Sequence, residues 1–336
     1  EQFLYEIGDP QNYILPDVSC DFTNVTMKEI GNDQVFVSGA RGKPPSNTYK
    51  VSATYLMGYR ISIAVIIVGI NAAKKAKVSA EAIIKKTERM FSDNDWSNYK
   101  DTKISIIGTE ATYGDNARHT QPREVLLRIM ATHEQKEALI LLSREIAQAL
   151  TGMTPGFTNM LGGRPSVSPS IRLFSFLLPK ENIRTTVDFN EKQFELEIWK
   201  TKSNNVNSKN TLSELSDNID TPDTEVSLIN LAYARSGDKG DHANIGVIAR
   251  KPEYLPYIRD SLTPKRVAKY FSHVVKGEVE RWDVPGIGAL NFLLRNSLGG
   301  GGMASLNIDP QGKAYAQQLL DIMIPVPHKI AEETKK

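Results

Sequence analysis

The sequence has little cysteine and no long apolar run. Its one cysteine, Cys20, excludes a disulfide and a cysteine-based zinc site within one chain, and it favours a reducing compartment. The most apolar stretch, ISIAVIIVGINAA at residues 61–73, is too short for a membrane span, which needs about 20 residues. The first residues, EQFLYEIGDP, are acidic rather than basic, unlike those of a signal peptide. We therefore expect a protein without a membrane span, located in the cytoplasm or the mitochondrial matrix and not secreted.

An excess of one charge is also missing. The 336 residues include 41 basic and 39 acidic side chains, which gives a formal net charge of +2. This balance gives no electrostatic reason to expect binding to nucleic acid or to an anionic membrane, because both favour a basic surface. Hydrophobic residues make up 40% of the chain, enough to bury the cores of about two globular domains.

Residues 201–225, TKSNNVNSKNTLSELSDNIDTPDTE, are polar and poor in large apolar side chains, which is typical of a flexible linker. They divide the chain into an α/β domain with a mixed sheet at residues 1–200 and a second domain at residues 226–327. A charged tail at residues 328–336 follows the second domain.

Periodic patterns in the first domain alternate between strand and helix. Strands are expected at 49–55, 59–69, 103–108, 124–131 and 171–179, and a hairpin within 20–39 around the turn at 31–33. A helix is expected from Asn71 to Phe91. A second helix is expected to end at Gly152 and to begin with a cap at Thr132, with Gln135 completing a capping box. The segment 151–170 is rich in Gly, Pro and Ser and is expected to be a loop.

Strands and helices alternate more closely in the second domain. The expected strands lie at 227–234, 244–249, 276–284 and 304–309. The expected helices lie at 252–262, 264–275, 288–298 and 312–323. This mixture within a short segment indicates a small α+β domain of ferredoxin-like type.

A segment between two of these strands, ARSGDKGDHANIG at residues 234–246, concentrates groups that can carry a proton or bind an anion. Its candidate catalytic residues are Asp238, Lys239, Asp241 and His242. A lysine beside two carboxylates can position a general acid or base, although the same side chains also suit a solvated loop. The two aspartates and the histidine could hold a divalent ion, but their spacing matches no strong metal signature, and we expect no metal.

Other glycine-rich and cationic loops are candidates for binding the anionic part of a substrate. The expected substrate-binding residues are Arg41, Lys50, Arg164, Asn244, Gly300 and Gly301. A cation beside glycines suits a carboxylate or phosphate, and it equally suits an ordinary loop charge. The run Gly299–Gly302 permits close approach to a phosphate or thioester, or forms a flexible hinge, and it lacks the G-K-[ST] of a P-loop.

Several long stretches, in order, resemble the acyclic terpene utilisation (AtuA-like) family. They include LYEIGDPQNYILPDVSCDF, VSGARGKPPSNTYKVSATY, GTEATYG, LGGRPSVSPSIRLFSFLLP, RSGDKGDHANIGVIARKPEYLP and ALNFLLRNSLGGGGMASLNIDPQGKAYAQQLLD. These stretches cover most of the chain apart from the linker. The resemblance implies a large N-terminal α/β domain followed by a small ferredoxin-like domain, in agreement with the patterns above.

The resemblance also implies that this chain corresponds to the C-terminal part of the family's protein, because family members carry an α/β segment ahead of LYEIGDP. The α/β domain would then lack its N-terminal part and expose strand edges and apolar surface. The implied partner is a polypeptide that carries the missing N-terminal part, in a homo- or hetero-oligomer.

The family context implies a role in the breakdown of branched acyclic terpenoid acids such as citronellate. An enzyme of hydratase, lyase or hydrolase type would act on a small-molecule acyl substrate, either a carboxylate or an acyl-CoA thioester. Coenzyme A would then be part of the substrate, and no other cofactor is expected. The alternative is a non-catalytic subunit that docks on a partner enzyme and stabilises it.

Overall fold

The computed structural model describes residues 2–196 and 220–335, so most of the expected linker at 201–225 lies outside the described residues. Contacts divide the chain into two compact units. Unit 1 comprises residues 1–53, 174–297 and 311–336, and unit 2 comprises residues 54–173 and 298–310. Each unit gathers segments from both of the domains expected at 1–200 and 226–327.

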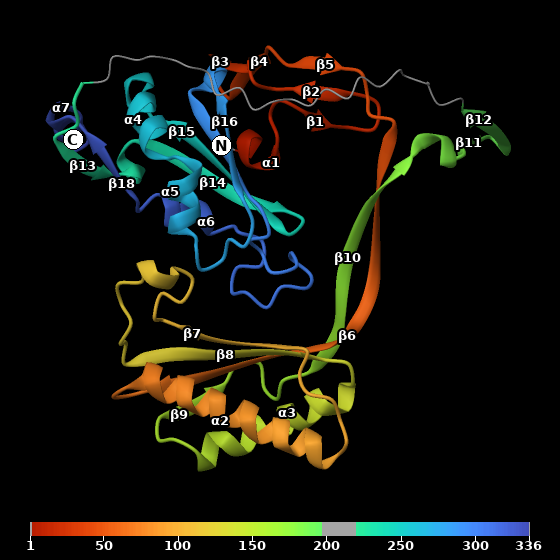
Figure 1. Ribbon diagram of the computed structural model, residues 1–336, viewed down its shortest axis with the longest axis vertical. Coiled ribbons are helices and arrows are strands. Elements are labelled where there is room, and N and C mark those ends of the chain that lie inside the picture. Colours follow the sequence, from red (N-terminus) through yellow and green to blue (C-terminus); the bar gives the residue numbers. More distant parts are fainter. Residues whose placement is uncertain (1, 197–219, 336) are drawn as a thin grey trace. The chain divides into compact units, whose positions relative to one another are not determined.

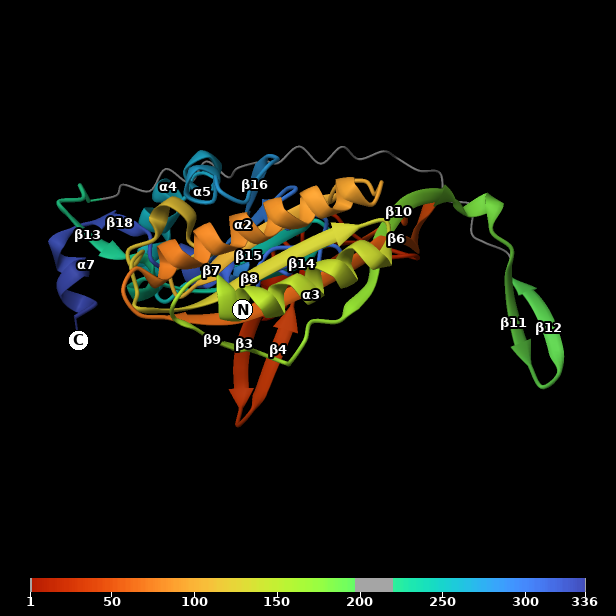
Figure 2. The ribbon, with the colours of Figure 1, turned by 90° about the horizontal axis from the view of Figure 1, so that it is seen from below.

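Unit 2 is built on a five-stranded sheet. Its strands are β6 (Thr48–Val68), β7 (Asp101–Ile107), β8 (Glu124–His133), β9 (Phe157–Met160) and β10 (Val167–Pro179), in the order β10-β6-β8-β7 with β9 also paired to β6. Two helices, α2 (Ala72–Asp93) and α3 (Lys136–Gly152), lie side by side across one face of this sheet (Figure 2). β6 and β10 each contain residues of both units.

The core of unit 2 lies between this sheet and its two helices. Because side chains alternate along a strand, the odd-numbered residues of β6 and β8 face the helices. The sheet contributes Ile61, Ile63, Val65, Ile67, Val125, Leu127 and Ile129, and the helices contribute Ala76, Ala80, Ile83, Leu139, Leu142 and Ile146, all buried. The even-numbered residues of the two strands therefore face away from the helices.

The structure corrects the expectation of separate strands at 49–55 and 59–69, which form the single strand β6. Gly58, which lies between the two expected strands, continues β6 with a φ of 111°, a conformation that glycine adopts without strain. A Cβ at Gly58 would lie 2.5 Å from the carbonyl oxygen of His133. The glycine therefore permits a close approach between neighbouring strands rather than ending one of them.

The expected cap at Thr132 is also wrong, because this residue lies in β8 and α3 begins only after Gln135. The imidazole of buried His133, rather than the hydroxyl of Thr132, accepts a backbone hydrogen bond just before α3. Its Nδ1 accepts a hydrogen bond from the backbone N–H of Gln135 at 2.9 Å, and its Nε2 donates to the carbonyl oxygen of Ser97 at 2.8 Å. The segment expected as a loop at 151–170 contains β9 and the start of β10.

A four-stranded antiparallel sheet forms the main layer of unit 1. Its order is β14 (Ala232–Lys239), β15 (His242–Ala249), β17 (Ala289–Leu294) and β16 (Val279–Val284). The helices are α4 (Leu255–Ser261), α5 (Pro264–Tyr270) and α6 (Tyr315–Leu319), and β13 (Thr224–Ser227) pairs with β18 (Met323–Val326). This combination confirms the expected small α+β fold.

Within the second domain expected at 226–327, the segments 288–298 and 304–309 differ from the sequence pattern. The expected helix at 288–298 is the strand β17, whose residues are all buried. A strand buried on both faces has no polar alternation, so its apolar run could not be distinguished from a helix. The segment 304–309, expected as a strand, consists of turns and irregular backbone.

The remaining elements of unit 1 are short. They are α1 (Gln2–Glu6), the sheet β1 (Tyr13–Ile14), β2 (Ser19–Asp21) and β5 (Arg41–Lys43), the hairpins β3 (Thr26–Gly31)–β4 (Gln34–Ser38) and β11 (Thr185–Phe189)–β12 (Lys192–Leu196), and α7 (His328–Glu333). The hairpin β3–β4 confirms the turn expected at 31–33, and Cys20 lies in β2. α1 packs against β14 and β15 (Figure 1).

Candidate functional site

The segment expected as a loop at 234–246 forms most of a β-hairpin. β14 and β15 pair along their whole length, and only Gly240 and Asp241 form the turn. Gly240 has a φ of 70°, which suits a two-residue hairpin turn. Because side chains alternate along β14, Asp238 and Lys239 leave the strand on opposite faces.

Tyr5, at the end of α1, is the centre of a group of three cations. The ring centroid lies 5.1 Å from the guanidinium carbon of Arg235, 5.6 Å from Nζ of Lys239 and 4.7 Å from Nζ of Lys313. All three distances are within the range of about 6 Å over which a cation is attracted to an aromatic face. The ring itself is buried, whereas the two ammonium groups are partly exposed. We call this group, together with Glu6 and Asp238, the Tyr5 cluster.

Two carboxylates complete the Tyr5 cluster. Oε2 of Glu6 lies 3.3 Å from Nζ of Lys239, and Oδ1 of Asp238 lies 4.0 Å from Nζ of Lys313. A hydrogen bond from Tyr5 and the neighbouring Lys239 lower the pKa of Glu6 below its usual value. The ammonium groups, at partly exposed positions, can bind an anion. The carboxylates beside them can transfer a proton.

Gly237 lets the Tyr5 ring approach the sheet. A Cβ at this position would lie 2.5 Å from Cε2 and 2.6 Å from Cδ2 of Tyr5, and 2.9 Å from Nζ of Lys313. Carbon atoms do not approach this closely, so any larger residue must displace the ring. Gly237, the first glycine of the RSGDKGDH stretch, is therefore required by its packing against Tyr5, whereas Gly240 belongs to the turn.

Asn244 and Asn291, both fully buried, hold the N-terminal segment against the sheet. Nδ2 of Asn244 donates to the carbonyl oxygens of Leu4, Tyr5 and Ile7 at 3.0–3.1 Å, and Nδ2 of Asn291 donates to that of Ile7 at 2.7 Å. The expectation that Asn244 contacts substrate does not fit this arrangement, because its amide is buried and used by the backbone. The residue positions the Tyr5 cluster instead.

His242 and Asp241 fasten the hairpin turn to the residues that follow β17. Nδ1 of His242 accepts a hydrogen bond from the backbone N–H of Asn296 at 3.0 Å, and the carbonyl oxygen of Asp241 accepts one from Ser297 at 3.0 Å. Burial, and after it the charge of Arg295, lower the pKa of His242 below its usual value. The imidazole is therefore neutral at neutral pH.

Gly300 and Gly301 lie in the loop 298–310, which belongs to unit 2. The φ values are 68° at Gly299, 99° at Gly300 and 81° at Gly301. The carbonyl oxygen of Gly301 accepts hydrogen bonds from the backbone N–H groups of Ala304 and Ser305 at 3.1 and 2.9 Å. The run therefore forms a defined turn, which only glycine enters without strain at three successive positions.

The other expected anion-binding residues are exposed. Arg41 lies in β5 and Lys50 in β6, both within unit 1, and Arg164 precedes β10 in unit 2. None of these three side chains makes a hydrogen bond or an ion pair within residues 2–196 and 220–335. The structure therefore assigns these three cations no structural contact of their own.

Sequence reasoning missed Tyr5, Glu6 and Lys313, which the fold brings to the Asp238–Lys239 hairpin from both ends of the chain. Each lies in a stretch that carries the family resemblance, LYEIGDP or DPQGKAYA. Nothing in their local pattern marks them, because an aromatic residue and a carboxylate in a short helix are more often structural. The one signal in the sequence that links these residues is that their stretches both carry the resemblance to the same family.

Residues 2–196 and 220–335 contain neither a membrane-spanning helix nor a cluster of metal-binding side chains. No helix there is both long and apolar enough to cross a membrane. No group of three or more His, Cys, Asp or Glu side chains in the same residues could hold a metal ion.

The fold and the Tyr5 cluster define a mixed α/β protein with a small ferredoxin-like part and a polar group at its sheet edge. The model of the acyclic terpene utilisation family protein AtuA matches residues 1–189, and that of the AtuA ferredoxin-like domain matches residues 226–325. The chain therefore belongs to the acyclic terpene utilisation family. Comparison with curated proteins and with solved structures gives no match.

Replacing Gly237 by alanine tests the packing of Tyr5. Because the new Cβ would overlap the ring, we expect Gly237→Ala to lower the free energy of unfolding by about 1–3 kcal/mol. Chemical denaturation followed by circular dichroism measures this change. Gly152→Ala is the matched control, since its Cβ would meet no atom within 4 Å. An equal loss from Gly237→Ala in a Tyr5→Ala background would contradict the proposed contact.

The buried His242 predicts a dependence of stability on pH. Its pKa is lower in the folded state than the value of about 6.5 in the unfolded chain, so the unfolded state binds the proton more tightly. This contribution to stability is complete above pH about 6.5 and is lost as the pH falls towards the folded-state pKa. Unfolding free energies of the wild type and His242→Gln, measured from pH 8 to pH 5, should converge or cross below this point. Parallel curves would exclude the effect.

Proposed function

We propose that the chain is an enzyme in the breakdown of branched acyclic terpenoid acids, acting on the carboxylate or on its acyl-CoA thioester. The observation that carries this proposal is the Tyr5 cluster, where two ammonium groups and two carboxylates meet at one buried ring. Membership of the acyclic terpene utilisation family supports the terpenoid class of substrate. Coenzyme A enters as part of the substrate.

The cluster suits a substrate that combines one anionic group with an apolar chain. Lys239 and Lys313 bind the carboxylate or stabilise the oxyanion that forms on a thioester carbonyl. Glu6 and Asp238 accept or deliver the proton that hydratase, lyase and hydrolase reactions all require. Asp241 belongs to the same turn, and His242, neutral at neutral pH, holds that turn in place.

The exposed cations have a separate proposed role. A coenzyme A ester carries several phosphate charges, and Arg41 and Lys50 of unit 1 are exposed cations that the described residues do not neutralise. We assign them to these phosphates. Arg164, Gly300 and Gly301 lie in unit 2 and stay a separate prediction of substrate-binding residues.

A non-catalytic subunit is the second candidate, and exposed apolar side chains favour it. These side chains are Met27, Ile30, Val35, Phe36 and Val37 on β3–β4, and Val187, Phe189, Phe194 and Leu196 on β11–β12. A hairpin of two strands is at best marginally stable alone in water, and apolar patches of this kind mark interaction sites. A polypeptide carrying further α/β structure of the family, or a second copy of this chain, would cover them.

Lys239→Ala tests the enzyme hypothesis. Because the variant removes both a cation and a partner of Glu6, we expect turnover of citronellate or citronellyl-CoA to fall by about 100-fold or more. Lys251→Ala is a matched control, because Lys251 also lies over a tyrosine ring, at 5.3 Å from that of Tyr254, and also pairs with a glutamate, Glu333, at 3.1 Å. Steady-state kinetics with both variants decide the matter. Wild-type turnover in Lys239→Ala would sink this proposal.

Phe36→Ser tests the subunit hypothesis. If β3–β4 docks on a partner, loss of this side chain should weaken the complex about tenfold or more, since hot-spot aromatics at interfaces contribute at least this much. Light scattering of the purified material over a range of concentrations measures the association. Val78→Ser is the control, because Val78 on α2 and Phe36 are both 56% exposed. Equal association of the two variants would count against docking through this hairpin.

A further inference from the structure

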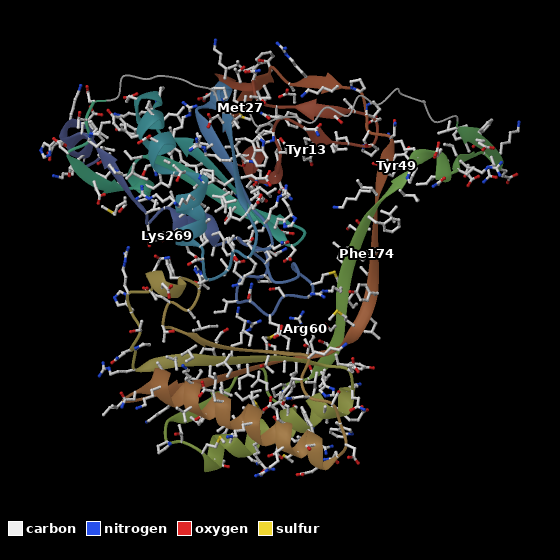
Figure 3. All side chains as sticks on the ribbon, viewed as in Figure 1. Tyr13, Met27, Tyr49, Arg60, Phe174 and Lys269 are labelled. Atoms are coloured by element: carbon white, nitrogen blue, oxygen red, sulfur yellow. The ribbon has the colours of Figure 1, made fainter. Side chains whose placement is uncertain are left out.

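The face of the unit 2 sheet opposite its helices carries one cation on each of four strands. They are Arg60 on β6, Lys103 on β7, Arg128 on β8 and Arg172 on β10. On β6 and β8 the alternation of the strand sends the apolar neighbours of Arg60 and Arg128 to the helices, so these arginines face away from α2 and α3. Figure 3 shows Arg60 on that side of the sheet.

The loop 298–310, also part of unit 2, lies over these cations. Arg60 donates from Nη1 to the carbonyl oxygen of Met303 at 2.5 Å and from Nη2 to that of Ser305 at 3.3 Å. Arg128 donates from Nη1 to the carbonyl oxygen of Leu306 at 3.0 Å. The loop therefore meets Arg60 and Arg128 with neutral backbone oxygens, and it meets Lys103 with the side-chain oxygen of Asn307.

Charge on this face is not compensated at its arginines. Neither Arg60, Arg128 nor Arg172 forms an ion pair with a carboxylate within residues 2–196 and 220–335. Burial, and after it the charge of Arg60, lower the pKa of Arg128 below its usual value. Arg60 and Arg128 are each only partly buried, and neighbouring like charges repel each other unless an opposite charge joins them.

Glycine brings the loop close to the third arginine. A Cβ at Gly300 would lie 3.1 Å from Nη2 of Arg172 and 3.3 Å from Cβ of Ala304. The glycine thus leaves room at the guanidinium that any side chain would fill. The side chain of Arg172 makes no hydrogen bond with the described residues.

We propose that Arg60, Arg128 and Arg172, under the loop 298–310, form a binding site for a small anion, either a carboxylate or a phosphate group. A guanidinium has five N–H donors, of which Arg60 uses two and Arg128 uses one, so donors remain for a bidentate contact. A carboxylate and a phosphate group each present two oxygens that a guanidinium can contact together. This site lies in unit 2, and its existence does not depend on the reaction proposed for the Tyr5 cluster in unit 1.

The test is a binding measurement on the full chain with two probes, inorganic phosphate and 3-methylbutanoate. Isothermal titration calorimetry in chloride at constant ionic strength gives the dissociation constant of each. We expect the wild type to bind at least one probe, and Arg172→Gln to weaken that binding about tenfold or more, the effect of losing a charged hydrogen-bond partner. Preference for phosphate would indicate a phosphate ester such as a CoA group, and preference for the carboxylate would indicate a free acid.

Arg144→Gln is the matched control, because Arg144 is exposed on α3 and makes no hydrogen bond or ion pair with the described residues. This variant should bind the probe as the wild type does. Binding of neither probe by the wild type, or equal binding by Arg172→Gln and the wild type, overturns the site.

A purely structural role of the arginines gives a different result. Hydrogen exchange of the loop 298–310 without anion should rise in Arg60→Gln, which loses two hydrogen bonds to the loop. It should stay unchanged in Arg172→Gln, which loses none. Equal loosening of the loop in both variants would show that Arg172 only fastens the loop, and would overturn its assignment to the anion.

Discussion

The buried amide pair of Asn244 and Asn291 is the constraint on which the Tyr5 cluster depends. Neither side chain has any exposed surface, and their amide groups satisfy carbonyl oxygens of the segment after Gln2. A buried donor left without its acceptor costs about 1–3 kcal/mol, so the strands and this segment stabilise each other. The first turn of the chain is therefore part of the ferredoxin-like half of unit 1, and Tyr5 reaches its cations only because this pair holds it.

Several elements followed directly from local physics, and others could not. The helix expected from Asn71 to Phe91 is α2, because its apolar side chains recur with helical spacing. The strand β17 was mistaken for a helix because burial on both faces removes the alternation that distinguishes a strand. The strand β6 was predicted as two separate strands, because the close approach of Gly58 to His133 that continues it is a tertiary contact. Local sequence patterns indicate the periodicity of an element, but they do not predict which residues of other elements pack against it.

The candidate site shows the same limit more sharply. Asp238 and Lys239 were found because glycines and charges gather in one short segment, and that segment does carry three members of the Tyr5 cluster, Arg235, Asp238 and Lys239. Asn244 was assigned to a ligand for the same reason, although its place in the strand buries it. Tyr5 is separated from the hairpin by most of the sequence and Lys313 by several further elements, and only the fold brings their side chains to it.

Charge distribution carries information that the net charge of +2 conceals. Exposed ion pairs such as Arg184–Glu195 and Lys251–Glu333 balance many of the cations. Arg60 and Arg128 of the unit 2 sheet instead meet carbonyl oxygens, which supply only part of the negative charge that a guanidinium attracts. A cation kept beside neutral oxygens and next to glycine stays available to an incoming anion, whereas one bound to a carboxylate does not. A nearly neutral chain can thus hold several cations close together at one place without a basic surface overall.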